Sequence, residues 1–266
     1  MSRVPLLRSL VVIALAFALS GVLQAQSSPA RTSPPYIMIK IDDLVANHGK
    51  VHPLWHKVVD YLKGRNLKCG IGIICNSLET DSPEYFQWIK EQHEGGLVEF
   101  WNHGFDHKGW EEAGKKMFEF KGPSYEQQKQ HLLRCNELAR QKLGFKLSAF
   151  GAGFNATDEN TVKALAEDPD TMIWLYGDPK HSAGKVVLER VFNVNIENPT
   201  FLPDVEKFKQ GYAKNPTKDY FVIQGHPTHW NDERWAQFTQ IIDFLVQEHA
   251  VFTTPSEYVK LKKLVK

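Results

Sequence analysis

Two adjacent aspartates and three histidines are the candidate metal-binding and catalytic residues of this sequence. Asp42 and Asp43 follow one short apolar run, His103 and His107 follow a second, and His226 follows a third toward the carboxyl end. Two neutral imidazoles and one carboxylate make a three-ligand set with open positions, which suits a divalent metal that also holds water and substrate. The other aspartate is then free to act as a base, and a further histidine can protonate a leaving group.

Each of these elements has a common structural explanation when it is seen alone. A pair of aspartates after a strand usually forms a turn or a helix cap, a histidine pair at this spacing is as often a solvated helix face, and a single histidine such as His226 is usually structural. Gly104 and Gly109 indicate that the histidine pair lies in a loop. The joint placement at successive strand ends favours a functional site. His48 and His229 flank these motifs and are secondary candidates.

The elements that must position these residues alternate between strand and helix. Such alternation predicts a mainly parallel sheet covered by helices, in which the carboxyl ends of the strands meet at one edge. We therefore predict an α/β fold, a single distorted (β/α) barrel with about seven parallel strands. The expected strands are 36–41, 68–75, 97–101, 147–150, 171–176, 186–194 and 220–224, and the expected helices are 52–63, 82–93, 124–143, 158–167, 205–213 and 233–248.

The amino-terminal residues have the pattern of an export signal. Two arginines precede a 14-residue apolar run, residues 10–23, which is short for a membrane span. We expect residues 1–25 to be a signal peptide, 26–35 a flexible spacer, and 36–266 one catalytic domain. An uncleaved anchor is the alternative, because Leu23 is large for its place before the cleavage site. We expect export to the periplasm or the extracellular space.

The charge balance bears on the kinds of partner. The 266 residues include 32 Lys and Arg and 31 Asp and Glu, and without the expected signal peptide 30 basic residues face 31 acidic ones. A chain this close to neutral has no overall field for nucleic acid, so we expect no nucleic-acid partner and no stable membrane partner after signal cleavage. The three cysteines, Cys69, Cys75 and Cys135, are expected to be free and buried. The sequence leaves the oligomeric state open.

Around the candidate residues the chain resembles the polysaccharide deacetylases, carbohydrate esterase family 4, with the NodB homology domain. The likeness is that of a divergent member and covers most of residues 36–260. Ile41–Asp43 is similar to the family's first motif, and Glu99–His107 is similar to its second. His226 and the ending Phe252–Tyr258 are similar as well.

The resemblance implies a metal-dependent hydrolase that removes acetyl groups from N-acetylated or O-acetylated carbohydrate. The enzyme class expected from it is a hydrolase acting on carbon–nitrogen bonds other than peptide bonds, which corresponds to the N-acetylated substrates. Metal-bound water would attack the amide carbonyl, with Asp42 as the general base and His226 as the acid. Asp43, His103 and His107 would hold the metal. Zinc is the first choice, with cobalt, nickel or iron as alternatives. Carbohydrate is the implied partner.

Substrate-binding residues are expected beside these motifs. They are Phe154, Asn155 and Trp230. An aromatic ring there could stack on a sugar ring, although core packing accounts for some aromatic residues near any site. Asp178 is a further candidate, for orienting His226.

Three positions depart from the family pattern. Gly104 stands where the family usually has Ser or Thr. The stretch 151–155 matches the third motif without the Arg that usually begins it and orients the base, and Gln224 replaces a bulky apolar residue, often Leu, that lines the acetyl pocket. Two alternatives therefore stand beside deacetylation: a secreted carbohydrate-binding or catalytically inactive relative, and a metal-dependent amidase acting on a non-sugar substrate.

Overall fold

The computed structural model describes residues 1, 31 and 33–264. The predicted signal peptide and most of the predicted spacer lie outside the described residues. Within the described part of the chain, no helix is both long enough and apolar enough to cross a membrane.

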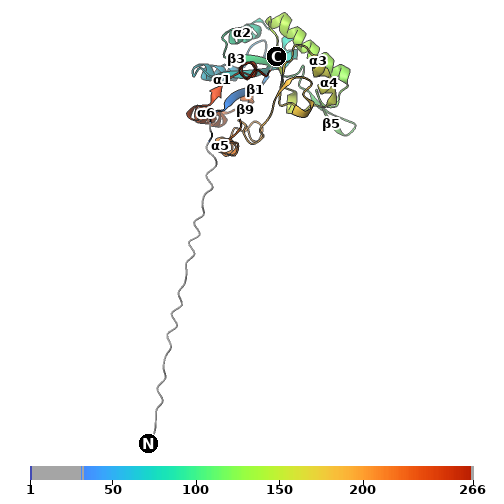
Figure 1. Ribbon diagram of the computed structural model, residues 1–266. Helices are drawn as coiled ribbons and strands as arrows, with labels where there is room; N and C mark the ends of the chain where they lie inside the picture. Colours follow the sequence, from blue (N-terminus) through green and yellow to red (C-terminus); the bar gives the residue numbers. More distant parts are fainter. Residues whose placement is uncertain (2–30, 32, 265–266) are drawn as a thin grey trace.

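A parallel sheet forms the centre of the protein and curls into a nearly closed barrel, as predicted (Figure 1). Neighbouring strands follow the order β1-β2-β3-β6-β7-β8, and β9 pairs with the other side of β1. A parallel bridge between Arg190 and Val222 joins the chain just after β8 to β9 and so brings the two edges together. The barrel strands are β1 (Tyr36–Leu44), β2 (Cys69–Ile73), β3 (Val98–Asn102), β6 (Ala149–Phe150), β7 (Ile173–Leu175), β8 (Val186–Leu188) and β9 (Tyr220–Gly225), and the short β10 (Val251–Phe252) pairs with the start of β1.

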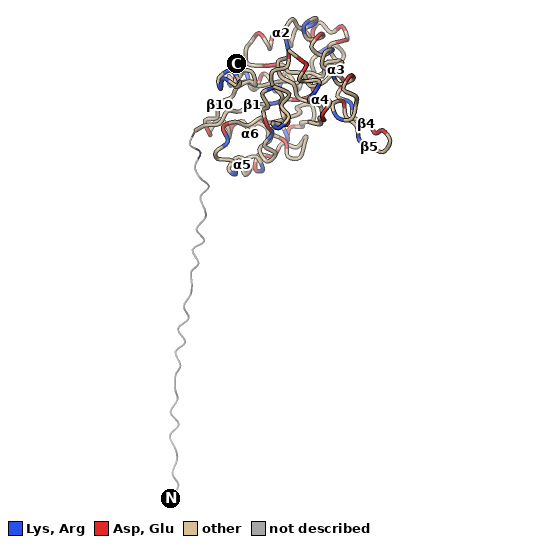
Figure 2. Tube along the Cα trace, turned by 45° about the vertical axis from the view of Figure 1, so that its right-hand side comes forward, with Lys and Arg blue, Asp and Glu red and all other residues tan. Residues whose placement is uncertain are grey.

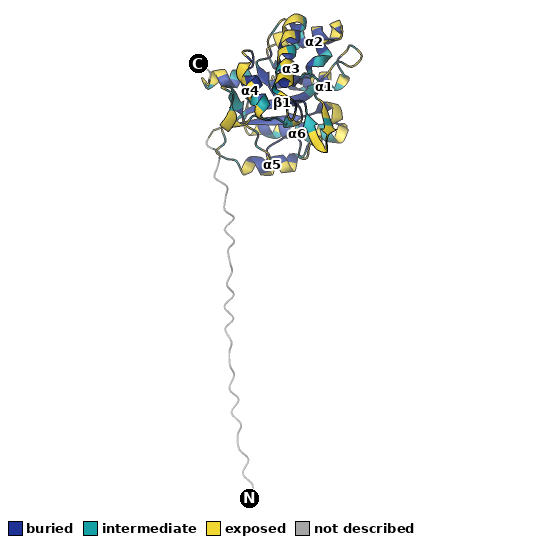
Figure 3. Cartoon of the chain, turned by 90° about the vertical axis from the view of Figure 1, so that its right-hand side faces the viewer, coloured by how far each residue is buried: buried dark blue, intermediate teal, exposed yellow. Residues whose placement is uncertain are grey.

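Helices cover the outside of the barrel and bury one face each. In α1 the buried residues Trp55, Val58, Val59 and Leu62 recur at the spacing of one helix face. Figure 3 shows this division, with buried strands inside and mixed buried and exposed residues on the helices, and Figure 2 shows basic and acidic residues interspersed along the chain. The helices are α1 (Pro53–Lys63), α2 (Pro83–Glu94), α3 (Tyr125–Leu138), α4 (Glu159–Glu167), α5 (Val205–Ala213), α6 (Asp232–Gln247) and α7 (Pro255–Leu261).

Several parts of the structure differ from the predicted elements, among them β10 and α7, which lie beyond the last expected helix. The expected strand 186–194 ends at Leu188, and the chain continues as an irregular stretch, here called the 189–204 segment. Val194 is completely buried in this segment, so part of the apolar pattern that resembles a strand serves core packing. The charged residues after His107 form an antiparallel hairpin, β4 (Gly109–Glu112) and β5 (Lys115–Phe118), that projects from the body (Figure 2).

The cysteines are free and buried, as predicted. Burial raises the pKa of the Cys69 thiol to about 12. A thiol with so high a pKa carries little thiolate and reacts slowly.

Close packing of α5 fixes the 189–204 segment. A Cβ atom on Gly211 of α5 would lie 1.6 Å from the carbonyl oxygen of Asn193. Only glycine therefore lets the helix backbone contact this segment, which carries Asn195 and Glu197 into the interior. Both side chains contact the candidate site described below.

Replacing Gly211 by Ala should lower the free energy of unfolding by about 3 kcal/mol or more, because the added methyl group meets backbone rather than a movable side chain. Urea denaturation measures the change. Gly95→Ala is the matched control, since Gly95 follows a helix in the right-handed conformation and its nearest atoms would lie 3.4 Å from the new Cβ. Equal stability of the two variants would contradict this account of the packing.

Candidate active site

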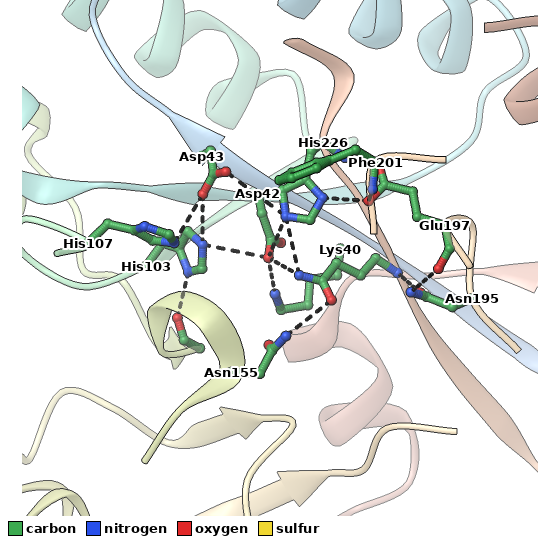
Figure 4. Close-up of polar contacts among 12 residues, drawn as sticks. Lys40, Asp42, Asp43, His103, His107, Asn155, Asn195, Glu197, Phe201 and His226 are labelled. Atoms are coloured by element: carbon green, nitrogen blue, oxygen red, sulfur yellow. Dashed lines mark hydrogen bonds and ion pairs between the residues drawn. The ribbon is translucent and has the colours of Figure 1, made fainter. Parts of the chain in front are cut away.

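The two aspartates stand at the carboxyl end of β1 and point in different directions (Figure 4). Asp43 has a left-handed backbone with φ of 72°, and the pairing register of β1 with β2 shifts between Ile41 and Leu44. This local twist leaves Asp42 fully buried while the Asp43 side chain keeps 23% of its surface exposed. One carboxylate therefore faces the barrel interior and the other faces its mouth.

Asp43, His103 and His107 come together as a group that can hold a metal ion. Asp43 Oδ1 lies 3.1 Å from His103 Nε2 and 3.4 Å from His107 Nε2. His103 Nδ1 lies 2.7 Å from the carbonyl oxygen of Gly151, which places the proton on Nδ1 and leaves Nε2 as an electron-pair donor. Two imidazole nitrogens and one carboxylate oxygen aimed at one point fit a divalent metal.

The charges around this group suit metal binding. Burial alone would raise the pKa of Asp43, but the contact with His103 and the nearby His107 and His226, which favour the ionised form, lower it well below its usual range. Burial and the neighbouring His103 lower the pKa of His107. An ionised carboxylate and a neutral imidazole are the protonation states that a metal requires of its ligands.

Asp42 lies beside the metal-ligand group with polar partners of its own. Asp42 Oδ2 accepts from Lys40 Nζ at 2.5 Å and from Gln224 Nε2 at 2.6 Å, and it lies 3.6 Å from His103 Nε2. Asn155 donates to the side-chain oxygen of Gln224 at 3.3 Å. Gln224 thus contacts the candidate base, and Asn155, an expected substrate-binding residue, reaches this network through Gln224.

His226 completes the site on the side opposite the metal-ligand group (Figure 4). Its Nε2 lies 3.9 Å from Asp42 Oδ2, and its Nδ1 lies 2.6 Å from Oε2 of the buried Glu197. Burial alone would lower the pKa of His226, but the hydrogen bond with Glu197 and the charges of Asp42, Glu197 and Asp43 raise it overall. The Nε2 atom of His226 therefore faces the space between the two carboxylates, 4.0 Å from Asp43 Oδ2.

Two expectations need correction. Asp178 does not orient His226: it pairs with His181 on the surface, with 2.8 Å between Oδ2 and Nδ1. Trp230 does not present a face for stacking, because its ring is 4% exposed and its Nε1 donates to Glu197 at 2.7 Å. Trp230 thus supports the carboxylate that holds His226.

Exposed aromatic rings flank the site on two sides. Phe154 is 52% exposed and its ring centroid lies 4.5 Å from that of His107. Phe201, which the sequence analysis missed, is 37% exposed and lies 4.9 Å from His226. His229 stacks on Phe201 with 4.0 Å between ring centroids, so this secondary candidate belongs to the rim of the site.

A buried glutamate holds the loop that carries His107. Glu119 accepts hydrogen bonds from the backbone N–H groups of Phe105, at 2.6 Å, and His107, at 2.8 Å, and also contacts His131. A Cβ on Gly104 would lie 2.5 Å from Glu119 Oε2. Gly104 also has a left-handed backbone with φ of 87°, so the glycine found where the family has Ser or Thr suits both this conformation and the glutamate packed against it.

Sequence reasoning missed Lys40, Glu197 and Glu119. For Lys40 a signal existed, because residues two apart on a strand share one face and Lys40 therefore accompanies Asp42 into the interior. Glu197 lies in an irregular segment, and Glu119 follows a charged hairpin. Neither position has a periodic pattern that would indicate burial.

Replacing Glu119 by Gln should weaken zinc binding by about 10-fold to 100-fold, because the amide cannot accept from both backbone donors and the loop carrying His107 loosens. Competition with a chromogenic chelator measures the affinity. Glu112→Gln, on the exposed hairpin strand β4, is the control, because it makes the same change of charge and leaves the loop that carries His107 intact. Equal zinc affinity of the two variants would show that Glu119 does not position the ligand.

The structure is similar to several solved structures, although no family model and no curated protein matches the sequence. One is the Xyl-CE4 domain of a multidomain xylanase from the hindgut metagenome of Trinervitermes trinervoides, with 16% identity, a TM-score of 0.59, and coverage of 88% of this chain and 93% of that one. Another is a family 4 acetyl xylan esterase from Clostridium thermocellum in complex with a cobalt ion, with 17% identity, a TM-score of 0.58, and coverage of 86% and 92%. A third is a CE4 family pseudoenzyme from Bacillus anthracis, with 13% identity, a TM-score of 0.56, and coverage of 86% and 67%. The chain therefore has the fold of the family 4 carbohydrate esterases, as its first two motifs predicted.

Proposed function

We propose that this protein is an exported, metal-dependent hydrolase that removes acetyl groups from N-acetylated or O-acetylated carbohydrate. The observation that carries the proposal is one site in which a buried carboxylate, Asp42, lies between a three-ligand metal group and a histidine held by a second carboxylate. The fold shared with acetyl xylan esterases and related proteins supports the substrate class. Export is proposed from the pattern of residues 1–25.

Asp43, His103 and His107 would hold the metal, and zinc is proposed for a hydrolytic site with this donor set. When bound, the metal supplies Lewis acidity that activates water and polarises an acyl carbonyl. Asp42 is placed to take a proton from the attacking water, because its carboxylate lies within 4 Å of both His103 and His226. His226 is placed to protonate the departing nitrogen or oxygen.

The surroundings of the site suit a neutral sugar. Phe154 and Phe201 present exposed rings on either side of the reacting groups, and an aromatic face packs well against the apolar face of a pyranose. The nearly neutral charge balance gives no field that would gather a polyanion. We therefore propose an uncharged acetylated glycan as the substrate class.

A direct test is acetate release from a panel of N-acetylated and O-acetylated glycans. Zinc-loaded protein should release acetate, dialysis against a chelator should abolish release, and added zinc should restore it, because the reaction depends on the ligand group. His107→Ala is the site-specific control, since it removes one ligand from the metal group. Acetate release by the chelated protein or by His107→Ala would contradict the proposal.

The role of His226 predicts a pH effect. A general acid must carry its proton, so turnover should fall as the pH rises through the raised pKa of His226. Glu197→Gln removes the carboxylate that raises this pKa and should shift the alkaline limb of the kcat profile to lower pH. His226→Ala should retain zinc and lose turnover at every pH, whereas His181→Ala, on the surface, should match the wild type. An unshifted limb in Glu197→Gln would remove His226 from the acid role.

A second candidate function is a non-catalytic carbohydrate-binding protein with the same fold. Two observations favour it: a pseudoenzyme is among the similar structures, and Gln224 places a polar side chain where the family pattern has an apolar one. A metal-dependent amidase on a non-sugar substrate uses the same residues. Glycan binding without acetate release would favour the carbohydrate-binding protein. Amide hydrolysis restricted to non-sugar compounds would favour the amidase.

A further inference from the structure

The carboxyl group of the candidate base Asp42 lies in the interior of the barrel. Asp42 is fully buried and Lys40 is 2% exposed. An isolated carboxylate at such a place costs several kcal/mol, and a partner of opposite charge offsets that cost. Among the described residues, Lys40 is the one Lys or Arg that forms an ion pair with Asp42, with 2.5 Å between Nζ and Oδ2.

Lys40 approaches Asp42 along the face of β1 that points inward. Residues two apart on a strand project to the same side, so the amine and the carboxylate meet without any contribution from a loop. The amine lies between aromatic rings, 4.5 Å from the centroid of Trp101 and 5.2 Å from that of Tyr176. Such rings accommodate a cation and hold it away from water.

The space that Lys40 fills lies over Gly151, at the end of β6. A Cβ on Gly151 would lie 3.3 Å from Lys40 Cε and 3.0 Å from Trp101 Cζ3. A long side chain at position 151 and the lysine at position 40 therefore compete for the same volume. Gly151 begins the stretch that matches the family's third motif without its Arg.

The partners of Asp42 leave one oxygen free. Lys40 and Gln224 both donate to Oδ2, whereas Oδ1 has no hydrogen-bond partner among the described residues. A buried acceptor without a partner is costly, so such an atom commonly marks a place for water or substrate. Two donors on one oxygen fix the orientation of the carboxylate.

We propose that Lys40 is the positioning residue of the general base: its amine, together with Gln224, holds Oδ2 of Asp42 and so fixes the carboxylate beside His103 and His226. This assignment rests on the proposed hydrolase function. It places on β1 the cation that the stretch beginning at Gly151 lacks. Lys40 does not touch the substrate and acts only through Asp42.

The first test replaces Lys40 by Met, which keeps much of the side-chain volume and removes the charge. Steady-state kinetics should show kcat reduced by about 100-fold or more, with KM and zinc affinity unchanged. Lys185→Met is the control, because Lys185 is a partly buried lysine bonded to the backbone oxygen of Asp168 and contacts none of the site residues. Wild-type kcat in Lys40→Met would overturn the proposal.

A relocation experiment separates the charge from the packing. The double variant Lys40→Ala with Gly151→Arg empties the volume over β6 and supplies a cation from the other strand. It should recover much of the kcat that Lys40→Ala loses, whereas Gly151→Met in the same background restores volume without charge and should not. Equal kcat in the Arg and Met double variants would assign Lys40 a purely structural role.

A measurement independent of activity keeps this test distinct from that of the proposed function. Lys40→Met should lower the urea midpoint when Asp42 is present and have a smaller effect in the Asp42→Asn background, because the two side chains are coupled. Equal effects in the two backgrounds would overturn the ion pair. A third outcome is that Lys40 and Asp42 are coupled but the wild type hydrolyses none of the glycans in the panel. That outcome would overturn the proposed function and the catalytic role of Lys40, and it would leave the ion pair established.

Discussion

Two carboxyl groups lie side by side at the end of β1, inside the mouth of a protein barrel, and much of the polar structure nearby contacts them. Water would stabilise such groups outside, whereas in the interior the stabilisation must come from fixed donors and opposite charges. Asp43 obtains it from His103 and His107, and Asp42 obtains it from Lys40 and Gln224. The same donors orient both carboxylates, so charge compensation and geometry are provided together.

The departures from the family pattern have physical counterparts elsewhere in the chain. Gly104 accompanies Glu119, which takes the space that a side chain would need and holds the loop of His107 through backbone donors. Gly151 accompanies Lys40, whose side chain fills the volume above it. A comparison of the motifs position by position shows three departures from the family pattern. In the folded protein, two of them, Gly104 and Gly151, are glycines packed against a charged side chain.

The irregular 189–204 segment contributes as much to the site as the strands do. Its Glu197 accepts from the backbone N–H of His226 at 2.7 Å, contacts the ring at Nδ1, and accepts from Trp230. Its Asn195 accepts from the backbone of Gln224. The close contact of Gly211 with Asn193 holds this segment against the barrel, so helix α5 helps to position His226.

The sequence by itself determined the alternation of strands and helices, the parallel barrel, and the placement of Asp42, Asp43, His103, His107 and His226 at strand ends. These features follow from local periodicity and from the rule that parallel strands end at one edge. Only the tertiary structure decided which groups hold those residues. Glu197, Glu119 and the volume shared by Lys40 and Gly151 are contacts between segments distant in sequence, and no local pattern records which buried charge will meet which partner.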